Sequence, residues 1–139
     1  MYKSKVVILG NSTVGKSSIL TQFKLNQFNV EIDSTIGCEF FAKSVMIKGD
    51  NEQEKEVKLL LWDTAGQEVF RTFTKNFLRG AQVVLIIFDV TNRDSFDDII
   101  HWLDETKMGA PKSKIVIAGN KNDLPAIIDD TDIRKLLSE

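Results

Sequence analysis

The sequence predicts an α/β fold with a mostly parallel, doubly wound sheet and one antiparallel edge strand. Short β-branched and apolar runs alternate along the chain with segments of helical spacing. The turn signal Gly49-Asp50-Asn51 lies between two extended segments and adds a hairpin to this alternation. The 139 residues, 42% of them hydrophobic, match the size of one domain with a real core. We therefore expect residues 1–139 to form a single domain.

The first predicted unit is a strand, a loop and a helix. Residues 5–9 are a β-branched run that ends at Gly10. Apolar residues then recur at helical spacing, at Ile19, Leu20 and Phe23. The polar residues 26–37 that follow show no sustained period, so we expect a long surface loop there.

Four further extended segments and two helical patterns complete the chain. The extended segments are residues 39–47, 57–62, 83–88 and 114–118. The first two form the hairpin, and the last two are continuous apolar runs typical of strands covered on both faces. A helical stripe lies between the last two and comprises Phe96, Ile99, Ile100 and Leu103, with Ser95 as its expected N-cap. A last helical pattern begins at Ile133, Leu136 and Leu137.

Composition excludes several classes of function. The net charge of −2 provides no basic field that would gather nucleic acid or an anionic membrane. One cysteine, Cys38, and one histidine, His101, allow neither an internal disulfide nor zinc-ligand spacing, which favours a reducing compartment. The longest apolar run, residues 83–88, is far shorter than the roughly 20 residues that span a bilayer. No secretory signal is apparent, so we expect a cytoplasmic location.

Residues 10–17 read GNSTVGKS and match the phosphate-loop motif G-x-x-x-x-G-K-[ST] in full, between a strand and a helix. Its glycines let backbone N–H groups face an anion, and the following helix adds its positive dipole end. Lys16 is expected to neutralise the β and γ phosphates, and Ser17 to ligate Mg²⁺. The predicted phosphate-binding residues are Asn11, Ser12, Thr13, Val14, Gly15, Lys16, Ser17 and Ser18. The alternative is a glycine-rich turn with an ordinary surface lysine.

A second group of chemical residues follows the second hairpin strand. Asp63 ends that strand, where its carboxylate is placed to hold the metal through water. A lone strand-end Asp is more often a helix cap. The residues that follow Asp63 favour a metal site over a helix cap, because Gly66 offers a backbone N–H to a γ-phosphate and Gln67 is suited to orient an attacking water. Positioning and charge neutralisation then carry most of the catalysis.

Residues 120–123, with the sequence NKND, predict a base-reading site at the end of another strand. The carboxylate of Asp123 pairs with the adjacent N1–H and N2 amine donors of guanine, and adenine has no such pair. A charged turn is the alternative for this short motif. Three motifs in order, each at the carboxyl end of a strand, make coincidence a poor explanation.

With these motifs the chain resembles the Ras superfamily of small GTPases, and most closely its Rab branch, over residues 3–139. Rab-like stretches are STIGCEF at 34–40, KLLLWDTAGQE at 58–68, FRT at 70–72, LRGA at 78–81 and DVT at 89–91. The resemblance implies a P-loop NTPase fold that binds GTP or GDP with Mg²⁺ and hydrolyses GTP, and a role in vesicle trafficking. It implies Mg²⁺ ligation by Ser17 and Thr35 and, through water, by Asp63.

The resemblance also assigns the remaining site residues. Gln67, Lys16 and Gly66 form the implied catalytic set, and Asn120, Lys121 and Asp123 hold the guanine, with Phe28 packed near the base. Two loops, residues 26–37 and 64–79, would order when the γ-phosphate is present. Effectors, an exchange factor and a GAP are the implied partners through these loops. The implied effector surface comprises Ile36, Phe40, Trp62 and Phe77, with core or edge packing as the alternative for Phe77 and Trp62.

The chain also departs from the family pattern. Ile32 stands where many members carry a tyrosine lid over the γ-phosphate. The family continues past the helix begun at Thr131 into a last strand, a Ser-Ala-Lys triplet that touches guanine, and a final helix. We therefore expect residues 1–139 to be a small GTPase domain that is incomplete at its C-terminus. Membrane attachment, on the cytosolic face of an endomembrane, would require a prenylated tail beyond these residues.

Two alternatives remain open at this point. A truncated, non-enzymatic interaction domain would bind guanine nucleotide weakly or not at all, because the Ser-Ala-Lys segment is absent. An ATP-specific P-loop enzyme would leave Asp123 without its donors. Nucleotide binding separates the three hypotheses.

Overall fold

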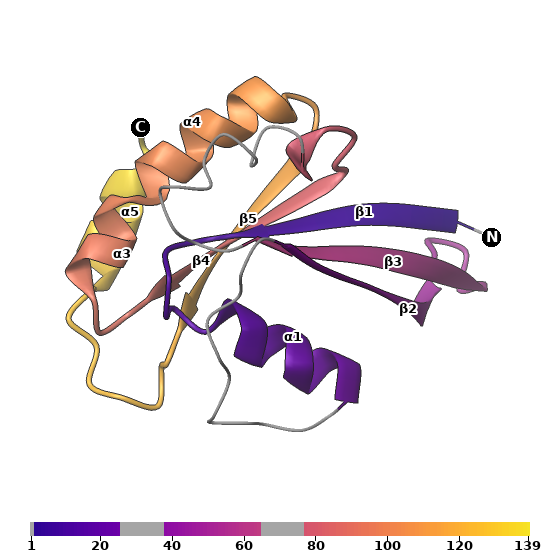
Figure 1. Cartoon of the computed structure of the whole chain (residues 1–139), viewed down its shortest axis with the longest axis horizontal. Helices are drawn as coiled ribbons and strands as arrows, with labels where there is room; N and C mark the ends of the chain where they lie inside the picture. Colours follow the sequence, from indigo (N-terminus) through magenta and orange to yellow (C-terminus); the bar gives the residue numbers. More distant parts are fainter. Residues whose placement is uncertain (1, 26–37, 65–76) are drawn as a thin grey trace.

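The computed structural model describes residues 2–25, 38–64 and 77–139. Its strands form one sheet in the order β2-β3-β1-β4-β5 (Figure 1). The strands are β1 (Tyr2–Leu9), β2 (Cys38–Lys48), β3 (Glu54–Thr64), β4 (Val83–Asp89) and β5 (Lys114–Asn120). Of these pairings only that of β2 with β3 is antiparallel. The predicted α/β fold, a mostly parallel sheet with one antiparallel edge strand, is confirmed.

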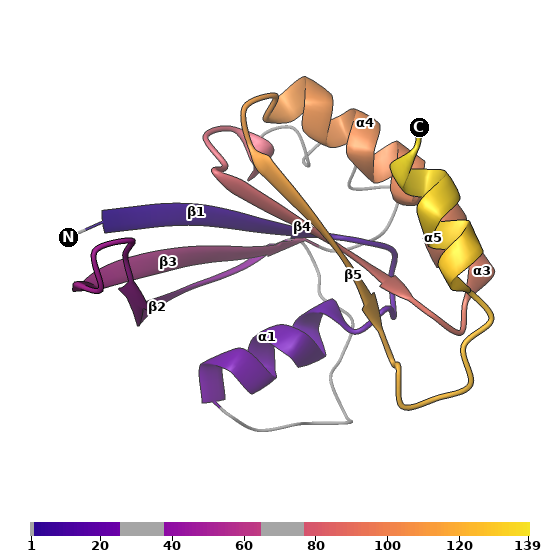
Figure 2. The same ribbon diagram turned by 180° about the vertical axis from the view of Figure 1, so that it is seen from behind.

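Helices cover both faces of this sheet. They are α1 (Lys16–Leu25), α3 (Arg93–Asp97), α4 (Ile99–Gly109) and α5 (Asp130–Leu137). Figures 1 and 2 show α1 on one face and α3, α4 and α5 on the other. Side chains alternate between the two faces, so that Val7 and Leu9 of β1 pack with the α3–α4 cluster and Ile8 packs with the α1 cluster. A doubly wound core with two apolar layers results.

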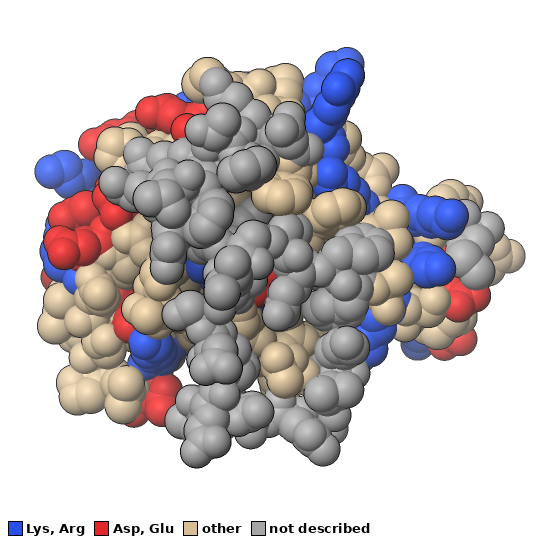
Figure 3. All heavy atoms as spheres, in the orientation of Figure 1, with Lys and Arg blue, Asp and Glu red and all other residues tan. Residues whose placement is uncertain are grey.

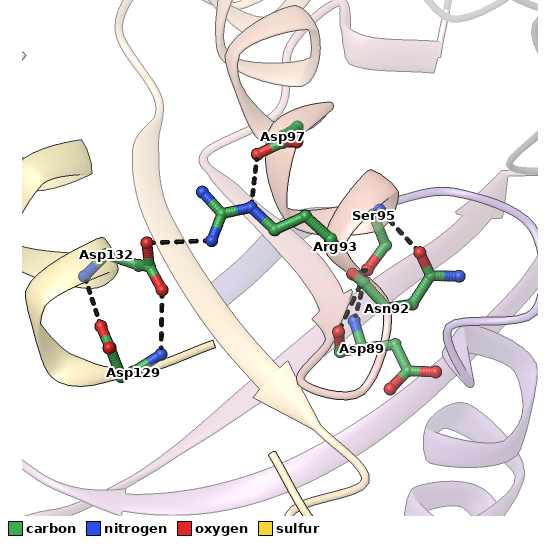
Figure 4. A network of polar contacts seen from close by, with 7 residues as sticks. All are labelled: Asp89, Asn92, Arg93, Ser95, Asp97, Asp129 and Asp132. Atoms are coloured by element: carbon green, nitrogen blue, oxygen red, sulfur yellow. Dashed lines mark hydrogen bonds and ion pairs between the residues drawn. The ribbon is translucent and has the colours of Figure 1, made fainter. Parts of the chain in front are cut away.

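The helix expected over residues 96–103 is two helices, and its predicted N-cap is wrong. Asn92 caps α3, because its side chain accepts a hydrogen bond from the backbone N–H of Ser95 at 3.2 Å (Figure 4). Ser95 lies buried within α3, where its hydroxyl donates to the carbonyl of Asn92 at 2.8 Å. Both residue types cap helices well, and the one a turn earlier takes the role here.

The buried stripe of these helices also differs from the prediction. Phe96, Ile99 and Trp102 are buried, whereas Ile100 is 46% exposed. The helical path breaks at Asp98, which ends α3 and precedes α4. The prediction continued one helical period across that break and therefore assigned the wrong residue to the core. Trp102 is buried in the place predicted for Ile100.

The two strands predicted to be covered on both faces have different surroundings. The prediction holds for β4, in which Val84, Ile86 and Ile87 are buried. It is wrong for β5, where Ile115 is 39% exposed and Val116 49% exposed. Within the described residues β5 is an edge strand of the sheet, at the opposite side from β2, and pairs only with β4.

Polar contacts join α3 to α5 (Figure 4). Arg93 donates to Asp97 at 3.1 Å and to Asp132 at 2.9 Å. Asp132 and Asp129 form a capping box that starts α5. Because Arg93 is exposed, solvent screens both of its ion pairs, and they contribute little to stability. On the described part of the face in Figure 3, acidic and basic side chains are interspersed.

No helix in the described ranges is both long and apolar enough to cross a membrane.

Candidate functional site

The predicted chemical residues gather at one edge of the sheet. Each of four parallel strands contributes at its carboxyl end. These contributions are the loop after β1, Asp63 near the end of β3, Asp89 at the end of β4 and Asn120 at the end of β5. Ligands of doubly wound sheets bind at this edge. Contacts between these segments, described below, make them one site.

The loop of residues 10–15 has a backbone that requires glycine at two positions. Gly10 has φ +148° and Gly15 has φ +103°. A Cβ on Gly10 would lie 2.3 Å from the carbonyl oxygen of Ile87, and one on Gly15 would lie 2.2 Å from Nδ2 of Asn120. A side chain at either position would be strained and would collide with its neighbour. Both glycines of the predicted motif therefore have a structural cause.

Nearly every carbonyl of this loop is already engaged. The carbonyls of Gly10 and Asn11 accept hydrogen bonds from Nζ of Lys16, at 3.0 and 2.8 Å. The carbonyl of Gly15 accepts the backbone N–H of Ile19 at 3.0 Å, which begins α1. Side chains from the end of β5 reach two more carbonyls, as described below. A trans peptide points its C=O and the next N–H in opposite directions, so the bonds from Lys121 and Asn120 to the carbonyls of Thr13 and Val14 direct the N–H groups of residues 14 and 15 away from the end of β5. Such N–H groups suit an anion.

Lys16 is buried beneath this loop, with 6% of its surface exposed. Burial lowers its pKa from 10.5 to about 8, and the nearby negative charge of Asp63 only partly offsets that effect. The ammonium group has three protons and its two loop carbonyls use two of them. A phosphate would supply both the third acceptor and the opposite charge that this buried cation needs.

Ser17 and Asp63 meet beside Lys16. The hydroxyl of Ser17, in the first turn of α1, donates to Oδ2 of Asp63 at 2.7 Å, and the Asp63 carboxylate is fully buried. A hydroxyl and a carboxylate are hard oxygen ligands. Mg²⁺ typically takes one or two protein ligands of this kind and completes its shell with water and phosphate oxygens. The residues present therefore fit the predicted magnesium site.

The NKND segment is joined to the phosphate loop by two side chains. Nδ2 of Asn120 donates to the carbonyl of Val14 at 2.8 Å. Nζ of Lys121 donates to the carbonyl of Thr13 at 2.9 Å. Asp123 is exposed in the same segment. The structure thus places Asn120 and Lys121 as links between two predicted sites, and the pairing of Asp123 with guanine stays a prediction.

Asp89 belongs to this site and was not among the predicted residues. Its Oδ2 lies 2.8 Å from Nζ of Lys121, and its Oδ1 accepts hydrogen bonds from the N–H and hydroxyl of Thr91 at 2.8 and 2.6 Å. Burial by itself would raise its pKa, but the bonds from Lys121 and Thr91 outweigh that effect and lower it. Its position at the end of β4 was a usable signal, because the other chemical residues share that position.

The side chain of Asn11 is held by the corner between α3 and α4. Its Nδ2 donates to Oδ2 of Asp98 at 2.6 Å, and its Oδ1 accepts from Nε1 of Trp102 at 3.0 Å. Sequence reasoning missed Asp98 and Trp102, which lie 87 and 91 positions away from Asn11. No motif spacing links residues so far apart.

The other predicted site residues fall into two groups. Ser12 and Thr13 are exposed, and Ser18 is half-buried in α1. Phe28, Thr35, Ile36, Gly66 and Gln67 lie outside the described residues.

The described part of the predicted effector surface is an aromatic contact. Trp62 and Phe77 are both half-buried, and their ring centroids are 6.0 Å apart. Phe40 pairs with Trp62 in the β2–β3 register. Mutual packing therefore accounts for part of the burial of Phe77, and its role toward partners stays a prediction.

Known proteins are similar to this sequence over most of its length. The Ras family model matches residues 5–136. "GTP-binding protein ypt4" of Schizosaccharomyces pombe is 40% identical over 124 residues, which are 88% of this chain and 53% of that protein. "Ras-related protein RABA2b" of Arabidopsis thaliana is 41% identical over 138 residues, 97% of this chain and 62% of that protein. The chain thus spans a little over half the length of such relatives.

Proposed function

The chain belongs to the Ras family as a Rab-like small GTPase, and we propose that it is a guanine-nucleotide switch that binds GTP and GDP with Mg²⁺ and hydrolyses GTP. One observation carries this proposal. The buried ammonium of Lys16 and the Ser17–Asp63 pair lie beneath one loop, in which Lys121 and Asn120 hold the carbonyls of Thr13 and Val14 so that the N–H groups that follow them point the opposite way. A cation with a spare proton, hard oxygen ligands and available N–H groups are what a nucleotide phosphate needs.

In this proposal Lys16 binds the β and γ phosphates, and Ser17 and, through water, Asp63 hold Mg²⁺. When bound, the metal neutralises charge on the phosphates. Thr35 completes the metal site, Gly66 donates to the γ-phosphate and Gln67 orients the attacking water. Positioning and electrostatic stabilisation then supply the catalysis, and we expect hydrolysis to be slow until a partner supplies an arginine finger.

Guanine selection is assigned to Asp123, with Phe28 packed near the base. Its carboxylate accepts from the N1–H and N2 amine of guanine, and adenine would leave it unpaired. The exposure of Asp123 supports this role, because its carboxylate is accessible to a ligand. Asn120 and Lys121 join this segment to the phosphate loop through the carbonyls of Val14 and Thr13.

The proposed partners are effectors, an exchange factor and a GAP that read the loops at residues 26–37 and 64–79. The proposed effector surface comprises Ile36, Phe40, Trp62 and Phe77. Residues 1–139 act as one small GTPase domain in this scheme. A role in vesicle trafficking on the cytosolic face of an endomembrane would use a prenylated tail beyond these residues.

Calorimetry of the 139-residue chain with GDP and Mg²⁺ tests the proposal. We expect GDP to bind and ATP to compete poorly. Asp123→Ala should remove the preference for guanine, whereas Asp50→Asn, which changes an exposed carboxylate in the hairpin turn, should leave it intact. If GDP does not bind, the nucleotide switch is refuted for this chain and the interaction-domain alternative stands. Equal competition by ATP would instead refute guanine selection.

A further inference from the structure

We infer that Asp98 and Trp102 are positioning residues for the phosphate loop, acting through the side chain of Asn11. The inference rests on the proposed nucleotide-binding function and extends it to the α3–α4 corner. Neither residue lies within the loop motif, and both contact it through a single amide.

The two partners of Asn11 fix its amide in one orientation. The Asp98 carboxylate only accepts hydrogen bonds, and the Trp102 indole N–H only donates. The Asn11 amide must therefore point Nδ2 at Asp98 and Oδ1 at Trp102, as observed. A flipped amide would lose both bonds, so this side chain has one position rather than two.

The two partners of Asn11 come from the packed corner between α3 and α4. Trp102 is 4% exposed and belongs to the core cluster beneath α4. Asp98 precedes α4, but its side chain makes no capping bond to that helix. Its carboxylate bonds Asn11 instead, with His101 4.0 Å away as its other polar neighbour. At Asp98, therefore, α4 lacks a side-chain cap, and the phosphate loop gains a charged hydrogen bond instead.

The two hydrogen bonds that fix the Asn11 side chain also affect the position of Lys16, through the main chain. The carbonyl of Asn11 accepts from Nζ of Lys16 at 2.8 Å, and that of the preceding Gly10 accepts at 3.0 Å. Any displacement of Asn11 therefore shifts the acceptors that place the Lys16 ammonium. By this route α4 determines where the phosphate-binding cation lies.

A charge exchange tests the inference. Asn11→Asp puts a second carboxylate 2.6 Å from that of Asp98, and the repulsion should displace the loop. Asp98→Asn in the same chain should restore a hydrogen bond with the donor and acceptor exchanged. We expect Asn11→Asp to release a fluorescent GDP analogue at least tenfold faster than the wild type. The double variant should return to within about threefold, and Asp104→Asn, an exposed change on α4, should have no effect.

Two further readouts separate positioning from a merely structural role. A variant Asn11→Asp with a lower melting temperature but an unchanged GDP release rate would overturn the inference, as would a double variant that is not rescued. In NMR spectra of the nucleotide-free chain, Asn11→Ala should move the indole N–H peak of Trp102, assigned with Trp102→Phe. An unmoved peak would also overturn it. Failure of the wild type to bind the GDP analogue would overturn the proposed function and this inference together.

Discussion

Substitution of Gly15 by alanine gives a prediction whose size follows from the geometry. At φ +103° an L-residue is strained, and the added Cβ would lie 2.2 Å from Nδ2 of Asn120. The Asn120 amide must then move, and its 2.8 Å bond to the carbonyl of Val14 is lost. Gly15→Ala thus combines a backbone cost with the loss of a link between two parts of the site.

The two costs can be separated with a second glycine. The strained backbone costs about 1–3 kcal/mol, and the broken hydrogen bond adds about 0.5–1.5 kcal/mol. Gly80 also has positive φ, at +77°, but an added Cβ there meets no atom within 4 Å. Gly80→Ala should therefore cost only about 1–2 kcal/mol. We expect Gly15→Ala to destabilise by about 1.5–4.5 kcal/mol, and to exceed Gly80→Ala by at least the roughly 0.5–1.5 kcal/mol of the lost hydrogen bond.

Urea denaturation without nucleotide, followed by tryptophan fluorescence, measures both variants. The slope m should match that of the wild type, so that a lower midpoint reports a lower free energy of unfolding. If the two variants lose the same free energy, the contact between residue 15 and Asn120 is not what restricts this position.

Three further substitutions test the charges of the site. Lys16→Met should be compared with the wild type across pH. The pKa of Lys16 is about 8 in the folded chain, below the ordinary value of 10.5 that applies to the unfolded chain. Between these two pH values the unfolded chain binds more protons than the folded chain. The wild type should therefore gain stability relative to the variant as pH rises through this window. Equal pH profiles in urea denaturation would contradict the shifted pKa. Lys121→Met should destabilise by about 1–3 kcal/mol, because buried Asp89 loses its ion-pair partner; an unchanged urea midpoint would argue against that pair. Ser17→Ala should reduce the acceleration of GDP release by EDTA, and an acceleration equal to that of the wild type would argue against Ser17 as a metal ligand.

Local patterns were enough to predict most of the fold and to predict which described residues gather at the carboxyl ends of the parallel strands. The phosphate loop is contiguous, so residues 10–17 showed it directly, and its glycines lie where the backbone requires them. Asp63 and Asn120 are distant in sequence, yet each lies near the end of an apolar strand. Parallel strands bring such ends to one edge, which is why the sequence placed both residues in the same site.

Contacts that depend on competition or on long-range packing were not predictable. Asn92 and Ser95 are both good caps, and only the packed structure shows that Ser95 is buried within α3. The break at Asp98 shifts the helical phase and puts Trp102 rather than Ile100 in the core. The bonds from Asn11 to the α3–α4 corner depend on how α4 packs on the sheet, which no short pattern records.

The phosphate and base motifs are physically one site rather than two. The carbonyls of Thr13 and Val14 accept their hydrogen bonds from Lys121 and Asn120, which the sequence pattern assigns to base reading. These bonds hold the loop carbonyls outward, and planar peptides then turn the following N–H groups toward the ligand side. Loss of either side chain should therefore weaken phosphate binding as well as guanine binding. In the proposed function, the spacing of the NKND segment is thus constrained from both ends, by the base and by the loop of residues 10–15.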